Sequence, residues 1–124
     1  MFLGGGFGAV CRVLLGQAAL HAWPGALMPW GTLGVNLLGS LLVGIIAGAL
    51  AGGWSLSHHG RLIIISGFLG GFTTFSACML ESLNLMQTGQ WSAALLNSLG
   101  SVLAGLLLVF AGFALGKALS SVWA

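Results

Sequence analysis

Charge is what this sequence has least of: its 124 residues include three Lys or Arg and one acid, Glu81. Soluble domains carry about 25% charged residues, so a chain with 3% could not cover its surface in water. The sequence has a single acid, no paired carboxylate and no activated nucleophile, so it also lacks the groups that enzyme catalysis requires. We therefore expect neither an enzyme nor a nucleic-acid partner.

Cysteine is scarce as well. Cys11 and Cys78 fall on different predicted helices without paired spacing, which argues against both a disulfide framework and a zinc site. We expect both thiols to be free. His21, His58 and His59 lie in or near loops with no carboxylate or thiol beside them, so we interpret them as wetted interface residues and not as metal ligands.

Long apolar runs are what the chain does have. Hydrophobic residues make up 58% of it, and a bilayer asks for about 20 apolar residues per crossing helix. The five tryptophans fall at the expected ends of the spans, where an indole ring is buried while its N–H stays wet. The sequence thus predicts an all-α, multi-pass membrane protein with one four-helix domain, whose spans cover about residues 2–22, 30–53, 61–86 and 91–119.

The loops carry little information on orientation. Arg61 and Lys117 belong to one side, the other side has no Lys or Arg, and Arg12 lies within a span. A chain with so weak a bias could insert both ways. Two oppositely inserted copies could then pair about an axis in the membrane plane, as inverted repeats do in larger transporters.

Small and polar residues form a stripe along the second span, at every fourth position. Its glycines predict close packing of helices. Asn36 does not fit that explanation, because its amide is costly in hydrocarbon and should face a partner helix, a cavity or a pore. The stripe consists of Thr32, Asn36, Ser40, Gly44, Gly48 and Gly52.

Polar groups interrupt two other spans. In the first, Arg12 shares a face with glycines and must be satisfied by protein or water. Two roles stay open for it: a clamp on carbonyls or on Glu81, or a source of positive potential beside an anion path. In the fourth span, Asn97, Ser98 and Ser101 gather on one side and indicate a second polar track.

The third span is broken near its centre by GFLGGFTTFSACML, residues 67–80. Phe68, Phe72 and Phe75 share a helix face, while Gly70 and Gly71 weaken the helix just before two threonines. Non-helical backbone at membrane depth survives only where it is buried or lines a wet cavity. Two explanations remain open on spacing alone: a glycine kink with hydroxyls rebonded to the backbone, or an ion site.

Three stretches together, GGGFGAVCR, WGTLGVNLLGS and GFLGGFTTFSACMLE, resemble the signature motifs of the Fluc (CrcB) family of fluoride channels, in the same order. The resemblance covers the whole chain. It implies a dual-topology dimer with two antiparallel pores that pass fluoride passively out of the cytoplasm, a central structural sodium ion, and a place in a prokaryotic plasma membrane.

The resemblance also implies roles for individual residues. Asn36 would donate to fluoride and Phe75 would offer its ring edge, while the backbone carbonyls of Gly70 and Thr73 would hold sodium. Glu81 would lie near a pore mouth or pair with Arg12. The remaining pore residues implied are Phe72, Thr74, Ser76, Thr32, Ser101 and Ser98.

One position departs from the family pattern, since Cys78 stands where a second phenylalanine is usual. Three outcomes are open: a neighbouring group substitutes, conduction differs, or a related, non-identical subunit supplies the ring. We expect a working homodimer. Two other functions compete with the channel: a small proton-coupled exporter, which needs an acid within the core of a span, and a non-conducting structural subunit, which leaves Asn36 unexplained.

Overall fold

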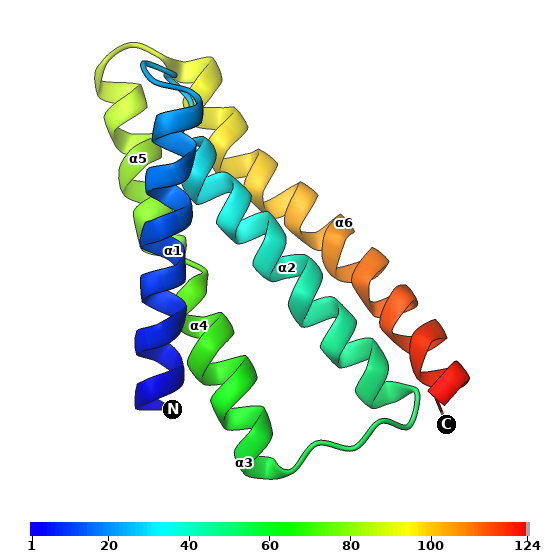
Figure 1. Ribbon diagram of the computed structural model, residues 1–124. Helices are drawn as coiled ribbons and strands as arrows, with labels where there is room; N and C mark the ends of the chain where they lie inside the picture. Colours follow the sequence, from blue (N-terminus) through cyan, green and yellow to red (C-terminus); the bar gives the residue numbers. More distant parts are fainter. Residues whose placement is uncertain (124) are drawn as a thin grey trace.

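The computed structural model describes residues 1–123, whose regular elements are all helices; these residues contain no strand (Figure 1). Four helical spans are long and apolar enough to cross a membrane, which confirms the predicted all-α membrane fold. The third span is divided into four segments. The elements are α1 (Phe2–Ala22), α2 (Trp30–Ala51), α3 (His58–Arg61), η1 (Leu62–Leu69), α4 (Gly70–Phe72), α5 (Phe75–Gln87) and α6 (Trp91–Trp123).

The predicted span boundaries are close to those observed, with three differences. Helix α2 ends at Ala51, and Gly52 caps it. The third span begins at His58, so both histidines assigned to a loop lie on a short helix whose N-cap, Ser57, accepts a hydrogen bond from the Gly60 N–H. Helix α6 runs on to Trp123, one turn beyond the predicted end.

The four spans form two parallel pairs (Figure 1). Helices α2 and α6 lie side by side and run in the same direction. Helix α1 lies along the third span, and these two run in the same direction as each other, opposite to that of α2 and α6. Both chain ends and the 52–57 connection therefore lie at one end of the bundle, which we call the terminal end. The connections 23–29 and 88–90 lie at the other, which we call the loop end.

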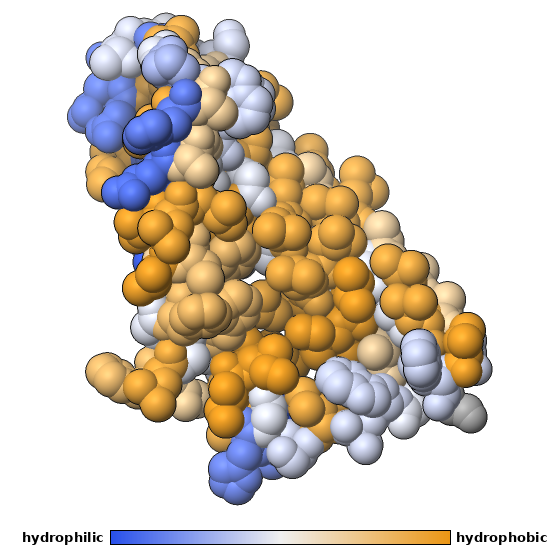
Figure 2. Space-filling model, in the orientation of Figure 1, coloured by the Kyte–Doolittle hydropathy of each residue, from blue (hydrophilic) through white to orange (hydrophobic). Residues whose placement is uncertain are grey.

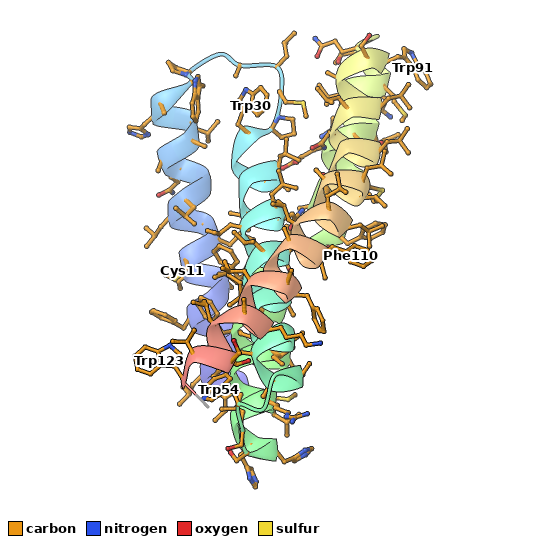
Figure 3. The ribbon with its side chains drawn as sticks, turned by 90° about the vertical axis from the view of Figure 1, so that its right-hand side faces the viewer. Cys11, Trp30, Trp54, Trp91, Phe110 and Trp123 are labelled. Carbon is orange, nitrogen blue, oxygen red and sulfur yellow. The ribbon has the colours of Figure 1, made fainter. Side chains whose placement is uncertain are left out.

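The outer surface suits a bilayer. Apolar residues cover the middle of the face shown in Figure 2, and hydrophilic residues gather at its two ends. Figure 3 places Trp54 and Trp123 at the terminal end, and Trp30 and Trp91 at the loop end. This distribution matches the interfacial belt expected for indole rings.

Glycines allow α2 and α6 to touch backbone to backbone. A Cβ added at Gly44 would collide with the Val109 carbonyl, and one at Gly48 with the Phe113 carbonyl. Gly112 and Gly116 of α6 play the same part against Leu41 and Ile45. The stripe predicted to pack closely does so, because only glycine lets two helix backbones approach to this distance.

Helix α1 packs on the third span in the same manner. The backbone of Gly8 lies against the Phe68 carbonyl, and a Cβ at Gly8 would come within 2.9 Å of the Phe72 nitrogen. Gly71 faces the backbone of Gly5 in return. The first and third spans are thus held at van der Waals contact immediately beside the break.

The break in the third span lies after the glycines and not at them. Gly70 and Gly71 are helical in α4, and the chain becomes extended at Thr73 (φ −84°, ψ 158°) and Thr74 (φ −150°, ψ 120°). The preceding η1 is an eight-residue π-helix. Nothing in the sequence indicated it, since an unbroken apolar run shows no difference between α and π periodicity.

We predict that Gly48→Val destabilises the protein, because its side chain would enter the backbone contact with Phe113 and Lys117. Overpacking of this kind costs about 1–3 kcal/mol in free energy of unfolding. Thermal unfolding of the purified protein, followed by circular dichroism, measures the loss. Gly34→Val is the matched control on the same helix, since no atom lies within 4 Å of a Cβ at Gly34. Equal melting temperatures for both variants would contradict the packing described.

Candidate functional site

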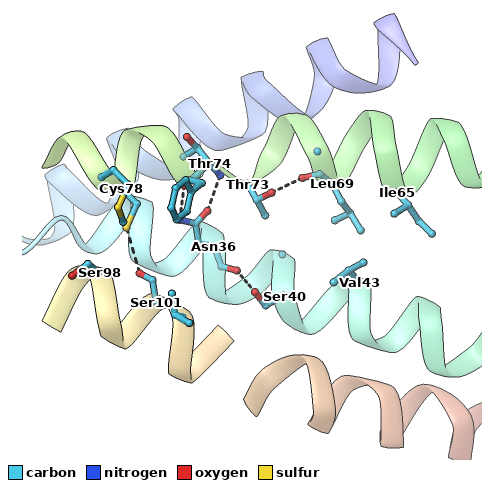
Figure 4. Close-up of a pocket in the computed structure, with 15 residues that line it drawn as sticks. Asn36, Ser40, Val43, Ile65, Leu69, Thr73, Thr74, Cys78, Ser98 and Ser101 are labelled. Carbon is cyan, nitrogen blue, oxygen red and sulfur yellow. Dashed lines mark hydrogen bonds between the residues drawn. The ribbon is translucent and has the colours of Figure 1, made fainter. Parts of the chain in front are cut away.

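A cavity of about 380 Å³ opens at the break, between α2, the third span and α6 (Figure 4). Its walls combine apolar side chains with a few amide, hydroxyl and thiol groups, and no charged side chain lines it. Seven of the residues implied for fluoride or sodium line this cavity. They are Asn36, Gly70, Thr73, Thr74, Phe75, Ser98 and Ser101.

Asn36 joins α2 to the extended backbone of the break. Its Nδ2 donates to the Thr74 carbonyl oxygen, and its Oδ1 accepts from the Thr74 N–H, both at 2.8 Å. The amide therefore satisfies both backbone groups of Thr74, as a neighbouring strand would. An amide nitrogen carries two hydrogens, so a second N–H remains on a side chain that lines the cavity.

The Thr73 N–H and the first turn of α5 also have local hydrogen-bond partners. The Thr73 N–H and the Thr73 hydroxyl both donate to the Leu69 carbonyl oxygen, at 3.0 and 2.9 Å. The Thr74 Oγ1 accepts from the Ala77 N–H and caps the first turn of α5. Such satisfaction is what allows irregular backbone to persist at membrane depth.

Phe75 begins α5 directly after the break and is 72% exposed in the single chain. It lines the cavity beside Asn36. The edge of a phenyl ring carries partial positive charge, so it can face an anion without a fixed charge. Asn36 and Phe75 thus bring two groups without formal charge, an amide N–H and an electropositive ring edge, to the same cavity.

A buried polar network joins α5 to α6 at the cavity. The Nδ2 of Asn97 donates to the Cys78 carbonyl oxygen at 3.3 Å and to the Ser82 Oγ at 3.1 Å. The Cys78 sulfur lies 3.6 Å from the Ser101 Oγ, and both groups line the cavity. Cys78 therefore brings a thiol to the wall, with Ser101 immediately beside it.

Most hydroxyls of the cavity are already donating. Ser40, Thr73, Ser98 and Ser101 each donate to the backbone carbonyl four residues earlier. In this arrangement their oxygens, and not their hydrogens, are free to face the cavity. On spacing alone, hydroxyls bonded to the helix backbone and an ion site are alternative explanations of the break. In the structure, hydroxyls bonded to the backbone line the cavity itself.

Three implied pore residues, Phe72, Ser76 and Thr32, lie outside the cavity. Phe72 is 3% exposed and stacks on Phe68, with ring centroids 5.7 Å apart, so it belongs to the core between spans. Ser76 is exposed on the first turn of α5. The first two positions follow from the break, which turns α5 and so separates Phe75 from the face that Phe68 and Phe72 share.

Thr32 and Glu81 line a separate cavity of about 350 Å³ beneath the 23–29 connection. The Thr32 hydroxyl donates to the Glu81 Oε1 at 2.7 Å. The Glu81 Oε2 is buried and has no hydrogen-bond partner within residues 1–123. Thr32, and not Arg12, is therefore the partner of Glu81 in this chain, while Arg12 lies half-buried on α1.

The end of α4 offers the carbonyl oxygen ligands that a small hard cation requires. Because the helix stops at Phe72, the carbonyls of its last residues lose the donors that a continuous helix would supply. The Leu69 carbonyl is taken by Thr73, whereas Gly70 is exposed and lines the cavity. Carbonyl oxygens are suitable ligands for such a cation, so the expected roles of Gly70 and Thr73 fit this geometry.

Sequence reasoning missed several residues of the cavity. Ser40 was seen in the stripe of α2 but given no role in the site. Cys78 was treated as a missing ring, although its thiol is part of the wall. The apolar lining offered no signal, because Gly39, Val43, Ile65, Leu69, Met79 and Val102 resemble any other membrane residues.

The chain is similar to known proteins over nearly its whole length. A family model described as "CrcB-like protein, Camphor Resistance (CrcB)" matches residues 1–113. A protein of Magnetococcus marinus is 46% identical over 115 residues, covering 93% of each chain. One of Novosphingobium aromaticivorans is 48% identical over 117 residues, covering 91% of this chain and 90% of the relative.

A third relative, from Thermus thermophilus, is 47% identical over 117 residues, covering 94% of this chain and 91% of its own. All three relatives carry the name "Fluoride-specific ion channel FluC". That name describes a channel, which agrees with the expectation that this chain is not an enzyme.

We predict that Asn36→Ala lowers the free energy of unfolding by about 1–3 kcal/mol, because it leaves the Thr74 N–H and carbonyl without partners beside the break. Chemical or thermal unfolding in detergent measures this loss. Asn84→Ala is the matched control, because the Asn84 side chain is exposed on α5. If the two variants unfold alike, Asn36 does not hold the break.

Proposed function

The chain belongs to the CrcB-like protein family, and from that premise we propose that it is a passive, fluoride-selective ion channel. The single observation that carries the proposal is the cavity at the break, which both Asn36 and Phe75 line and which no charged side chain lines. Fluoride holds its water tightly, so a path for it must replace that water with concentrated donors.

A neutral wall favours conduction over binding. A fixed cation in the cavity would hold fluoride too long for rapid passage, whereas amide hydrogens and ring edges attract it moderately. The hydroxyls of Ser98 and Ser101 rotate about their C–O bonds, so each can exchange its backbone carbonyl for a passing anion. We assign these two serines to the path as reversible donors.

In this proposal the thiol of Cys78 replaces the missing phenyl ring as a donor to the anion. Its sulfur lies beside the Ser101 hydroxyl in the cavity lining, and its S–H can exchange the Asn97 carbonyl at 3.7 Å for an anion, in place of a ring edge. A thiol is a weak donor, so conduction differs in rate while the path stays complete. No second kind of subunit is then required.

We further propose that two copies pair in opposite orientations and form two antiparallel pores. The cavity is open in the single chain, and each span remains mostly uncovered, with 22% or less of its apolar window buried. Arg61 and Lys117 give only a weak orientation signal at the terminal end.

Sodium is the cofactor of this proposal. The carbonyls of Gly70 and Thr73 from both copies would hold it near the two-fold axis, and its charge would fasten the two breaks together. This role rests on the donor set at the end of α4 and on the resemblance of the motif.

Passive transport suffices for export. Hydrofluoric acid crosses membranes as a neutral molecule and ionises in a less acidic cytoplasm, where fluoride accumulates. A channel in the plasma membrane of a prokaryotic cell then lets the ion leave down its gradient. A proton-coupled exporter is less well supported, because Glu81, the only acid, lies in the separate cavity with Thr32.

Fluoride efflux from liposomes that contain only this chain tests the proposal. We expect rapid fluoride release, followed with a fluoride electrode, and no chloride release from matched liposomes. The rate should not depend on a proton gradient, because the proposed path couples to no second ion.

Other outcomes have distinct meanings. No fluoride release from a folded protein would contradict a self-sufficient channel, and release on adding a second, related chain would show a heterodimer. Dependence on a proton gradient would favour the exporter. Equal release of chloride would overturn selectivity.

We predict that Phe75→Ile slows fluoride efflux on the order of tenfold, which corresponds to a loss of ~1.4 kcal/mol of stabilisation along the path. Isoleucine fills similar space but has no electropositive ring edge. Phe110→Ile is the matched control, since Phe110 is 73% exposed against 72% for Phe75 and does not line the cavity. Unchanged efflux in Phe75→Ile would show that this ring only packs.

A further inference from the structure

A third cavity, far from the break, has no part in the proposed path. It encloses about 550 Å³ at the terminal end, where α2 stops and α6 continues. Gly52 packs against Ser120, after which the chain turns away from α6 at Gly53 (φ 111°). The cavity remains between the two diverging segments, and Ala49, Gly53, Trp54, Ser55, Ser120 and Trp123 line it.

The residues that line this cavity are of the types found where lipid headgroups meet acyl chains in a bilayer. Trp54 and Trp123 lie at the same end in Figure 3 and are 48% and 88% exposed, so their rings form the rim. Indole rings prefer this depth in a bilayer, and their N–H groups donate to ester or phosphate oxygens. Ser55 adds an exposed hydroxyl, whereas the Ser120 hydroxyl is occupied by the Lys117 carbonyl at 2.8 Å.

Charge selects the kind of lipid. The terminal end carries Lys117 and Arg61. The residues of the loop end, 22–30 and 87–91, include no Lys or Arg. Basic residues beside a membrane attract anionic headgroups, so the two ends of the bundle differ in the lipid they favour.

We propose that this cavity binds one anionic glycerophospholipid. Its phosphate and glycerol lie at the rim formed by Trp54 and Ser55, on the positive side of the molecule, and the first part of an acyl chain lies between Trp123 and Ala49. The volume falls within the range of ordinary small-molecule sites. The site depends only on membrane insertion and not on the proposed fluoride path.

Tryptophan fluorescence with brominated lipids tests the proposal. One reporter protein keeps only Trp54 and Trp123, with Trp23, Trp30 and Trp91 changed to Phe; its matched control keeps only Trp30 and Trp91. Each is reconstituted in phosphatidylcholine with brominated phosphatidylglycerol or with brominated phosphatidylcholine. We expect the first reporter to be quenched preferentially by phosphatidylglycerol, the control to show no preference, and Lys117→Gln to reduce that preference roughly fivefold.

Three results would overturn the proposal. Equal quenching of Trp54 and Trp123 by both lipids would remove the charge selection. The same preference at Trp30 and Trp91 would show a general attraction of the protein for anionic lipid. Weak quenching by either lipid at Trp54 and Trp123 would mean that protein, such as a second copy, covers the cavity.

Native mass spectrometry of the protein with its tryptophans intact gives a second test if a reporter does not fold. We expect bound phosphatidylglycerol to be retained by the unaltered chain and lost in Ser55→Phe, which fills the cavity from an exposed loop position. Ser92→Phe, at an exposed position beside Trp91, is the control and should retain it. Equal retention by both variants would contradict a lipid in this cavity. Fluoride efflux is not the readout, so this test is independent of the proposed function.

Discussion

The two hydrogen bonds between the Asn36 amide and the backbone of Thr74 are the interaction on which the break in the third span depends. Two extended residues at membrane depth expose an N–H and a carbonyl that neither lipid nor their own helix can satisfy. Asn36 satisfies both with one side chain. Because Asn36 also lines the cavity, the group that stabilises the break is the same group that presents a donor to an ion.

The geometry around this pair separates neutral donors from charged groups. Asn36, Phe75 and the serines of α6 share one cavity, while Glu81 is held by Thr32 in another and Arg12 lies on α1. Close contacts at glycines keep the helices near enough for this arrangement, since Gly8 and Gly71 place α1 against the segment that precedes the break. The polar arrangement at the break therefore depends on the close helix packing at the glycines.

The sequence allowed the spans, the glycine stripes and the existence of the break to be predicted, because each leaves a pattern of hydrophobicity or spacing. The sequence indicated a helix weakened at Gly70 and Gly71 just before the threonines; in the structure both glycines remain helical and the chain becomes extended at the two threonines. Spacing alone placed Phe72 and Phe75 on one face, but the break turns α5 and leaves Phe72 in the core. The π-helix, the α5–α6 network around Asn97 and the direction of each hydroxyl depend on tertiary contacts, so no local pattern indicated them.

Fluoride efflux through Asn36→Asp tests the central claim most directly. Aspartate keeps an oxygen that can accept from the Thr74 N–H, but it replaces the amide donor with negative charge inside the cavity. The account predicts a folded protein, as judged by its melting curve and its elution from a sizing column, that releases no fluoride from liposomes. Efflux at the rate of the unaltered chain would contradict it, because the ion would then pass without meeting residue 36.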